Sequence, residues 1–134
     1  MASEERGEGG AIAPEMTAFE EILQRINAMG GFEASVLASG DGLPIASAPS
    51  DYDFHTIAAM VAVLASVAGE TQSRVGLGQL DEVSVLADDR IRLVCRYFTV
   101  AEEEFILAVV TPPNCPYRRA TNRAIREIEK AWAH

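Results

Sequence analysis

Few residues in this 134-residue chain have a type and spacing that could carry out chemistry. The two histidines, His55 and His134, lie far apart in the sequence, and no cysteine pair has the CxxC spacing of a metal or redox site. Cys95 and Cys115 fall in separate predicted elements, where reduced and partly buried thiols are the expectation. The sequence therefore predicts no metal site and no disulfide.

Sequence motifs for nucleotide binding or acyl transfer are also missing. The chain has no GxxxxGK[ST] phosphate loop, and the Gly76–Gly78 segment follows a predicted helix instead of opening one. Ser66 and Ser73 lie on the same predicted helix as His55, and the chain has no GxSxG nucleophile elbow. We predict no cofactor site and no catalytic triad.

Two clusters of charged residues remain as candidates. Glu102-Glu103-Glu104 falls in a predicted hairpin turn, where solvated carboxylates are expected. Arg90, Arg92 and Arg96 alternate onto one face of a predicted strand. An arginine can stabilise phosphoryl transfer, but arginines in the middle of a strand more often pair with carboxylates on neighbouring strands. We expect no catalytic residue and a protein that is not an enzyme.

The bulk composition limits the class of partner. Eleven basic residues against twenty acidic residues give a formal charge of −9, which disfavours nucleic acid and anionic membranes because both need a basic surface. No segment has the roughly 20 uninterrupted apolar residues of a membrane-spanning helix. Residues 1–10 are rich in Glu and Gly and do not resemble a signal peptide. We therefore expect a cytoplasmic protein that does not insert into a membrane.

Hydrophobic periodicity and turn signals predict one α+β domain over residues 14–134, preceded by a disordered acidic tail over residues 1–13. Its element order is αββαβββα, and the short links between strands predict a five-stranded, mainly antiparallel sheet between helices. The predicted helices are Pro14–Met29, Phe54–Val75 and Cys115–Ala133, and the predicted strands are Phe32–Ser39, Leu43–Ala48, Glu82–Ala87, Arg90–Phe98 and Glu104–Thr111.

The Phe54–Val75 helix organises the rest of the chain. Residues 54–69 contain no Asp, Glu, Lys or Arg, and Asp53 is placed to cap the helix N-terminus through its side chain. At 100° per residue, its two sides differ in size more than in polarity. One arc is bulky (Phe54, Ile57, Met60, Val61, Val63, Leu64, Val67 and Val75) and the other is small (His55, Ala58, Ala59, Ala62, Ala65, Ser66 and Gly69).

We expect the bulky arc to cover the sheet. The small arc would then be an apolar surface that nothing else in the chain covers, and such surfaces mark interfaces. Small side chains would let a second helix approach closely. The sequence therefore predicts a dimer interface that includes four small residues of this helix: Ala58, Ala62, Ala65 and Gly69.

The order and spacing of these elements resemble the roadblock / dynein light chain family, which includes the bacterial gliding regulator MglB. Four segments carry the resemblance: the Val36–Ala46 strand, Asp-Gly turn and strand; the Ala-rich helix around Ile57–Met60; the strand Leu80–Val85; and Ile91–Val94. No single motif is diagnostic, because the family signature is spread over the chain. An acidic hairpin at Val100–Glu104 and the Pro112-Pro113 pair depart from the pattern.

The resemblance implies a profilin-like fold and a dimer, either a homodimer or a heterodimer with a paralogue. In such dimers the third strands pair into one continuous sheet, which here would use Val83, Ser84, Val85 and Leu86. The paired central helices form a platform for a Ras-like small GTPase, here near His55, Ala59, Ser66 and Glu70. MglB-like members of the family activate the GTPase largely by reshaping its own active site.

Two alternatives stay open from the sequence. The protein could be a scaffold or adaptor subunit that has no effect on GTP turnover. It could also be a small-molecule sensor domain, since profilin-like sheets can hold ligands, although a ligand pocket needs convergent polar groups that the sequence does not identify.

Overall fold

The computed structural model describes residues 17–50 and 53–132. The predicted tail over residues 1–13, and the predicted helix start at Pro14, lie outside the described residues. The N-terminal helix is described over residues 17–30 and precedes β1 (Ala34–Ser39), β2 (Pro44–Ala48), α2 (Phe54–Val75), β3 (Glu82–Leu86), β4 (Arg92–Val100), β5 (Glu103–Thr111) and α3 (Arg118–Trp132). This order confirms the predicted αββαβββα architecture.

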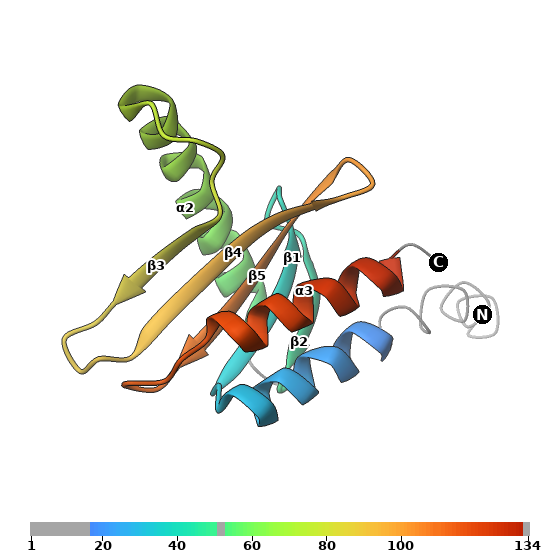
Figure 1. Ribbon diagram of the computed structural model, residues 1–134. Coiled ribbons are helices and arrows are strands. Elements are labelled where there is room, and N and C mark those ends of the chain that lie inside the picture. The colour runs from blue at the N-terminus through green and yellow to red at the C-terminus, as the bar shows by residue number, and fades with distance from the viewer. Residues whose placement is uncertain (1–16, 51–52, 133–134) are drawn as a thin grey trace.

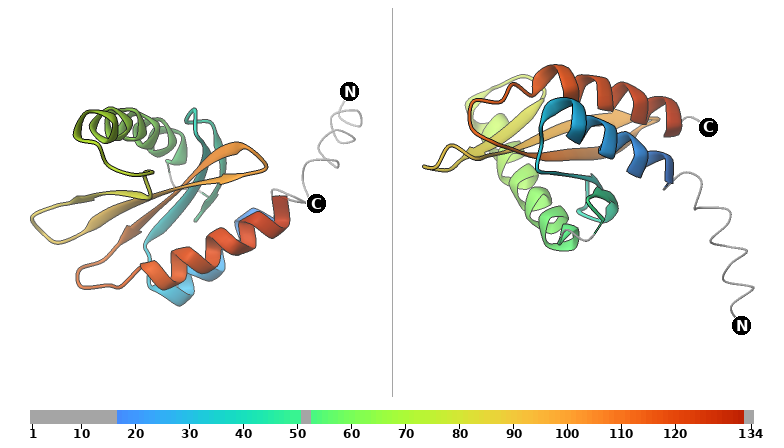
Figure 2. Two further views of the ribbon diagram at one scale, coloured as in Figure 1. Left: turned by 45° about the horizontal axis from the view of Figure 1, so that its top comes forward. Right: turned by 90° about the horizontal axis from the view of Figure 1, so that it is seen from below.

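The five strands form one sheet in the order β2-β1-β5-β4-β3, and every neighbouring pair is antiparallel. Helix α2 covers one face, while the N-terminal helix and α3 lie side by side on the other (Figures 1 and 2). The two edges of the sheet are β2 and β3. Pro44 opens β2, as expected for an edge strand, because proline cannot donate to a central ladder.

The larger core lies between the sheet and the paired helices. Phe19, Leu23 and Ile128 from the helices are buried against Leu37 and Leu107 of the sheet. At one end, the indole of Trp132 packs at 5.0 Å, edge to face, on the ring of Phe105. Burying an aliphatic or aromatic side chain of this size contributes about 1.5–3 kcal/mol, so this layer supplies much of the stability of the fold.

Alternation along β4 separates two environments. Leu93, Cys95 and Tyr97 face α2, whereas Val94 and Phe98 face the paired helices. The alternation predicted from the sequence is confirmed, and the same strand therefore contributes to both cores.

The two ends of α2 differ in how they are capped. Gly76 adopts a left-handed conformation (φ 85°) and its N–H donates to the carbonyl of Gln72, which is a C-terminal cap that favours glycine. The predicted cap at the other end is wrong, because the Asp53 side chain makes no capping hydrogen bond. Only its backbone carbonyl takes part, by accepting the Ile57 N–H at 3.4 Å.

Candidate interaction surface

Helix α2 contacts the sheet through a face that combines small and bulky apolar residues. Ala58 and Val61 are both 0% exposed, and Ile57, Leu64 and Ala65 pack around them. The small side chains at positions 58 and 65 let the helix backbone approach the sheet. The prediction that the bulky arc covers the sheet is therefore confirmed for half of its members (Phe54, Ile57, Val61 and Leu64) and wrong for the other half (Met60, Val63, Val67 and Val75).

Four other bulky apolar side chains of α2 are exposed: Met60, Val63, Val67 and Val75. Met60, Val63 and Val67 are 53%, 55% and 59% exposed. Their spacing of three and four residues places them on one side of the helix. We call these three residues the outward stripe. A contiguous apolar stripe on a surface is a candidate site for protein contact.

The four small residues predicted for the dimer interface do not share one free surface. Ala58 is fully buried within its own chain and cannot contact a second one, and Ala65 packs on the sheet. Ala62 faces the β1–β2 turn, since a Cβ built on Gly42 would lie 2.9 Å from the Cβ of Ala62. Only Gly69 is open, with no atom within 4 Å of the Cβ position. The predicted interface is therefore wrong at Ala58, whereas contact of the half-buried Ala62, Ala65 and Gly69 with a second chain stays a prediction.

The predicted GTPase-contact residues all lie on the solvent side of α2. His55, Ala59, Ser66 and Glu70 are exposed. Ala59 and Ser66 neighbour the outward stripe in the sequence. The carboxylate of Glu70 lies 3.8 Å from the guanidinium of Arg74, an exposed pair that contributes little to stability. These four residues are accessible, and contact with a GTPase stays a prediction.

Strand β3 presents a free backbone edge. It pairs with β4 on one side, and its other side is an edge of the sheet. Val85 and Leu86 are 47% and 43% exposed, Ser84 is exposed and Val83 is half-buried. An edge with unpaired N–H and C=O groups can add a further strand.

A buried arginine connects this edge to α3. The guanidinium of Arg96 on β4 donates to the hydroxyl of Thr121 at 2.6 Å and to the side chain of Asn122 at 2.8 Å. It also forms an ion pair with Asp81, 3.4 Å away and just before β3. The predicted pairing of a strand arginine with a carboxylate is thus confirmed at Arg96.

A second arginine completes the connection. Arg118, at the start of α3, lies 2.9 Å from Asp81 and 2.7 Å from Glu82, and the Tyr117 hydroxyl donates to Glu82. Partial burial alone would raise the pKa of Asp81, but the hydrogen bond and charge of Arg118, with those of Arg96, hold it below its ordinary value. The edge strand is therefore held on α3 by charge-assisted contacts at its N-terminal end.

The remaining candidate groups are two thiols, Arg92 and three carboxylates. Cys95 and Cys115 are free thiols, and burial raises the pKa of Cys95 to about 12, so it stays protonated. Arg92 lies over the ring of Tyr117, 5.9 Å from its centroid. The carboxylates of Glu102, Glu103 and Glu104 are exposed. Among residues 17–50 and 53–132, no group of three His, Cys, Asp or Glu side chains is placed to hold a metal ion.

The outward stripe was missed by reasoning from the sequence, although its spacing was visible there. Met60, Val63 and Val67 were assigned to the sheet on the basis of size. The sheet-facing side carries Ile57, Val61 and Leu64 together with Ala58 and Ala65, so side-chain size alone does not separate the two sides of the helix.

Comparison with known proteins extends over most of the fold. The Roadblock/LC7 domain model matches residues 18–111, from the N-terminal helix through β5. Among solved structures, MglB of Myxococcus xanthus superposes with a TM-score of 0.75 at 16% identity, covering 88% of this chain and 90% of that one. The gliding protein MglB of Thermus thermophilus gives 0.72 at 18% identity, with coverages of 87% and 90%.

A Roadblock/LC7 domain from Streptomyces avermitilis also superposes, with a TM-score of 0.71 at 19% identity, covering 85% of this chain and 94% of that one. No significant match is found among curated protein sequences. The structural likenesses establish the fold, and the domain model matches well over half of the sequence. The chain belongs to the Roadblock/LC7 domain family.

Proposed function

We propose that this protein is a non-enzymatic dimeric regulator of a Ras-like small GTPase and acts in the cytoplasm. The observation that carries the proposal is that one chain exposes two surfaces suited to protein contact, the outward stripe of α2 and the free edge of β3. The two free thiols fit a reducing compartment.

The apolar composition of α2 supports the proposed dimer. By length and composition alone, α2 is the one helix among the described residues that could cross a membrane. However, one side of it packs on the sheet, and Glu70 and Arg74 interrupt the exposed side near its end. A protein surface of matching shape fits this helix better than lipid. A second copy of the chain, or a paralogue, would supply both an apolar helix and an edge strand.

Binding of a GTPase is supported by family membership and by charge. The resemblance to MglB-like proteins implies a platform on paired α2 helices, and the exposed residues His55, Ala59, Ser66 and Glu70 would lie on it. A net charge of −9 favours a partner with a basic contact surface. Arg96 is buried and already occupied, which makes it unsuited to reach into a GTPase. The resemblance to MglB-like proteins supports activation through the active site of the GTPase itself.

The test is single-turnover GTP hydrolysis by the Ras-like GTPases of the same organism, measured with and without the full chain. We expect faster hydrolysis, and we expect Ser66→Arg to weaken binding. Glu21→Arg, on the exposed side of the N-terminal helix, is the control and should bind normally. Binding without faster hydrolysis would make the protein a scaffold or adaptor subunit. Lack of binding to any such GTPase would refute the proposal.

A further inference from the structure

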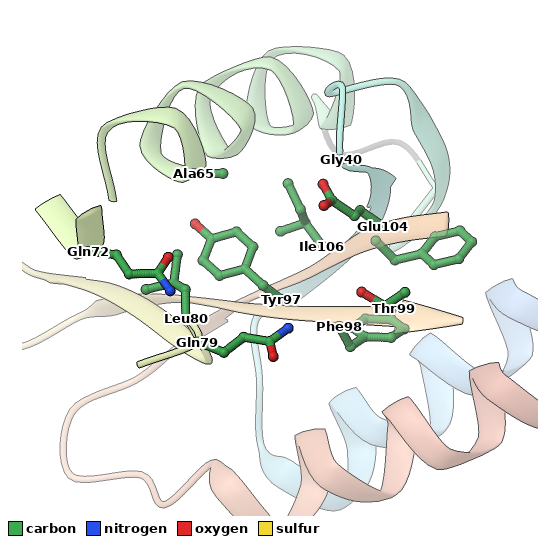
Figure 3. Close-up of a pocket in the computed structure, with 11 residues that line it drawn as sticks. Gly40, Ala65, Gln72, Gln79, Leu80, Tyr97, Phe98, Thr99, Glu104 and Ile106 are labelled. Atoms are coloured by element: carbon green, nitrogen blue, oxygen red, sulfur yellow. The ribbon is translucent and has the colours of Figure 1, made fainter. Parts of the chain in front are cut away.

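A pocket of about 220 Å³ lies between the C-terminal half of α2 and the sheet (Figure 3). Its floor consists of two cross-strand pairs of β4 and β5, Tyr97 with Ile106 and Thr99 with Glu104. Strand alternation places all four side chains on the α2 side of the sheet. Side chains of α2, Ala65 and Gln72, form the roof.

Gly40 lines one end of the pocket and leaves space for the side chain of Glu104. A Cβ at Gly40 would lie 2.9 Å from the Cβ of Glu104 and 3.1 Å from its Oε1. Because glycine has no side chain, the Glu104 side chain can lie over this turn with its carboxylate at the pocket (Figure 3). Glu104 forms no ion pair with any described residue.

The charge of the lining selects the class of ligand. Within the described part of the chain, Glu104 is the one carboxylate lining the pocket, and no lysine or arginine lines it. Burial raises the pKa of the Tyr97 phenol, so it stays neutral. A phosphate or carboxylate ligand would therefore meet one negative charge and no positive one.

The walls also offer contacts to the apolar part of a ligand. The half-buried side chain of Leu80 and ring of Tyr97 supply apolar surface, whereas Ile106 is almost fully buried beneath them. A cation beside a tyrosine ring gains a further attraction. The buried Tyr97 hydroxyl has no hydrogen-bond partner among the described residues.

We propose that this pocket binds a small organic cation, with its ammonium group at the Glu104 carboxylate and a short apolar chain against Leu80 and Tyr97. The site is separate from the surfaces that the proposed function uses, because it lies on the sheet side of α2. It supplies the convergent polar groups that could not be located in the sequence. They come from segments far apart in the chain: the turn at Gly40, helix α2, the loop at Gln79-Leu80 and strands β4 and β5.

The test uses three probes with the same four-carbon chain: n-butylamine, 1-butanol and sodium butyrate, titrated at pH 7 into the isotope-labelled full chain and followed by backbone-amide NMR. We expect butylammonium to shift the amides of Tyr97, Thr99, Glu104 and Ile106 with an affinity of about millimolar, reasonable for so small a ligand. Butyrate should leave these amides unchanged.

Two variants and one control assign the charge. Glu104→Gln should weaken butylammonium binding about fivefold, the upper range for one partly exposed ion pair. Thr99→Lys should weaken it similarly, because the new ammonium would face Glu104 across the strand pair. Glu102→Gln, in the same hairpin but outside the pocket, should bind normally. Equal binding of the three probes, shifts outside the pocket, or unchanged affinity in Glu104→Gln would overturn the proposal.

Discussion

Arg96 on β4 and Thr121 on α3 are joined by a charge-assisted hydrogen bond of 2.6 Å in the buried layer between sheet and helix. The Thr121 hydroxyl in turn donates to the carbonyl of Tyr117 at 2.8 Å. Because Arg96 also pairs with Asp81 before β3, this contact fixes the edge strand relative to α3. The edge strand that we propose for dimerisation is thus fixed on α3 by contacts within its own chain.

Replacing Thr121 with valine removes the acceptor and leaves the buried guanidinium with one fewer partner. We expect the free energy of unfolding to fall by about 1.5–3 kcal/mol, the range for a hydrogen bond to a charged group. Urea denaturation followed by circular dichroism measures this change. Thr71→Val is the matched control, because Thr71 also bonds a helix carbonyl, that of Val67 at 3.1 Å, but is exposed. Equal losses in both variants would contradict the assigned role of Arg96.

Enlarging Ala58 should destabilise the fold, whereas enlarging its neighbour Ala59 should have little effect on stability. Ala58 is 0% exposed against the sheet, whereas Ala59 is exposed. Ala58→Leu should cost about 1–3 kcal/mol through overpacking, and Ala59→Leu should change stability by no more than about 0.5 kcal/mol. Thermal unfolding of the two variants at one concentration compares them. A larger loss in Ala59→Leu would mean that the orientation of α2 is wrong.

Stability should fall on acidification in a window set by Asp81 and Glu127. The pKa of Glu127 is held below its ordinary 4.5 chiefly by the hydrogen bond from Arg25, with Arg123 adding to it. The pKa of Asp81 lies below its ordinary 3.8, because the two arginines outweigh its partial burial. The folded protein therefore binds these protons less tightly than the unfolded chain does. Their contribution is fully present above the ordinary pKa values and is lost as the pH falls through the lower, folded ones.

We expect the free energy of unfolding to decrease below about pH 4.5, and the Asp81→Asn, Glu127→Gln double variant to show a shallower decrease. Denaturant titrations at a series of pH values give the slope directly. Glu129→Gln is the control, because Glu129 is exposed and pairs with no basic group of residues 17–50 or 53–132. A double variant that retains the full slope would rule out these two carboxylates as its source.

Periodicity was sufficient to predict the order of elements, the bounds of α2 and the two faces of β4. Each depends on a local pattern: a charge-free helical run ended by Gly76, or alternation such as Leu93, Cys95 and Tyr97. Strand ends were predicted less well, since β4 runs to Val100, two residues beyond its predicted end at Phe98. Pairing with β5 extends it there.

The orientation of α2 could not be predicted, because the helix is apolar around most of its circumference. Only the sheet decides which side is covered. It covers Ile57, Ala58, Val61, Leu64 and Ala65 and leaves Met60, Val63 and Val67 exposed. The sequence predicted that a strand arginine pairs with a carboxylate, as Arg96 does with Asp81, but not its contacts with α3 and not the pocket at Glu104. These last two depend on contacts between segments that are distant in the chain, which no local pattern encodes.

The most direct test of the central claim is the mass of the protein in solution, measured by multi-angle light scattering at micromolar concentration. We expect the wild type to have twice the 14.4 kDa mass of the chain. Val63→Arg should shift it to the monomer, because a charge in the middle of the outward stripe would be buried without a partner. Met29→Arg, exposed on the opposite side of the sheet, should remain a dimer. A monomeric wild type, or a Val63→Arg variant that stays dimeric, would contradict the account.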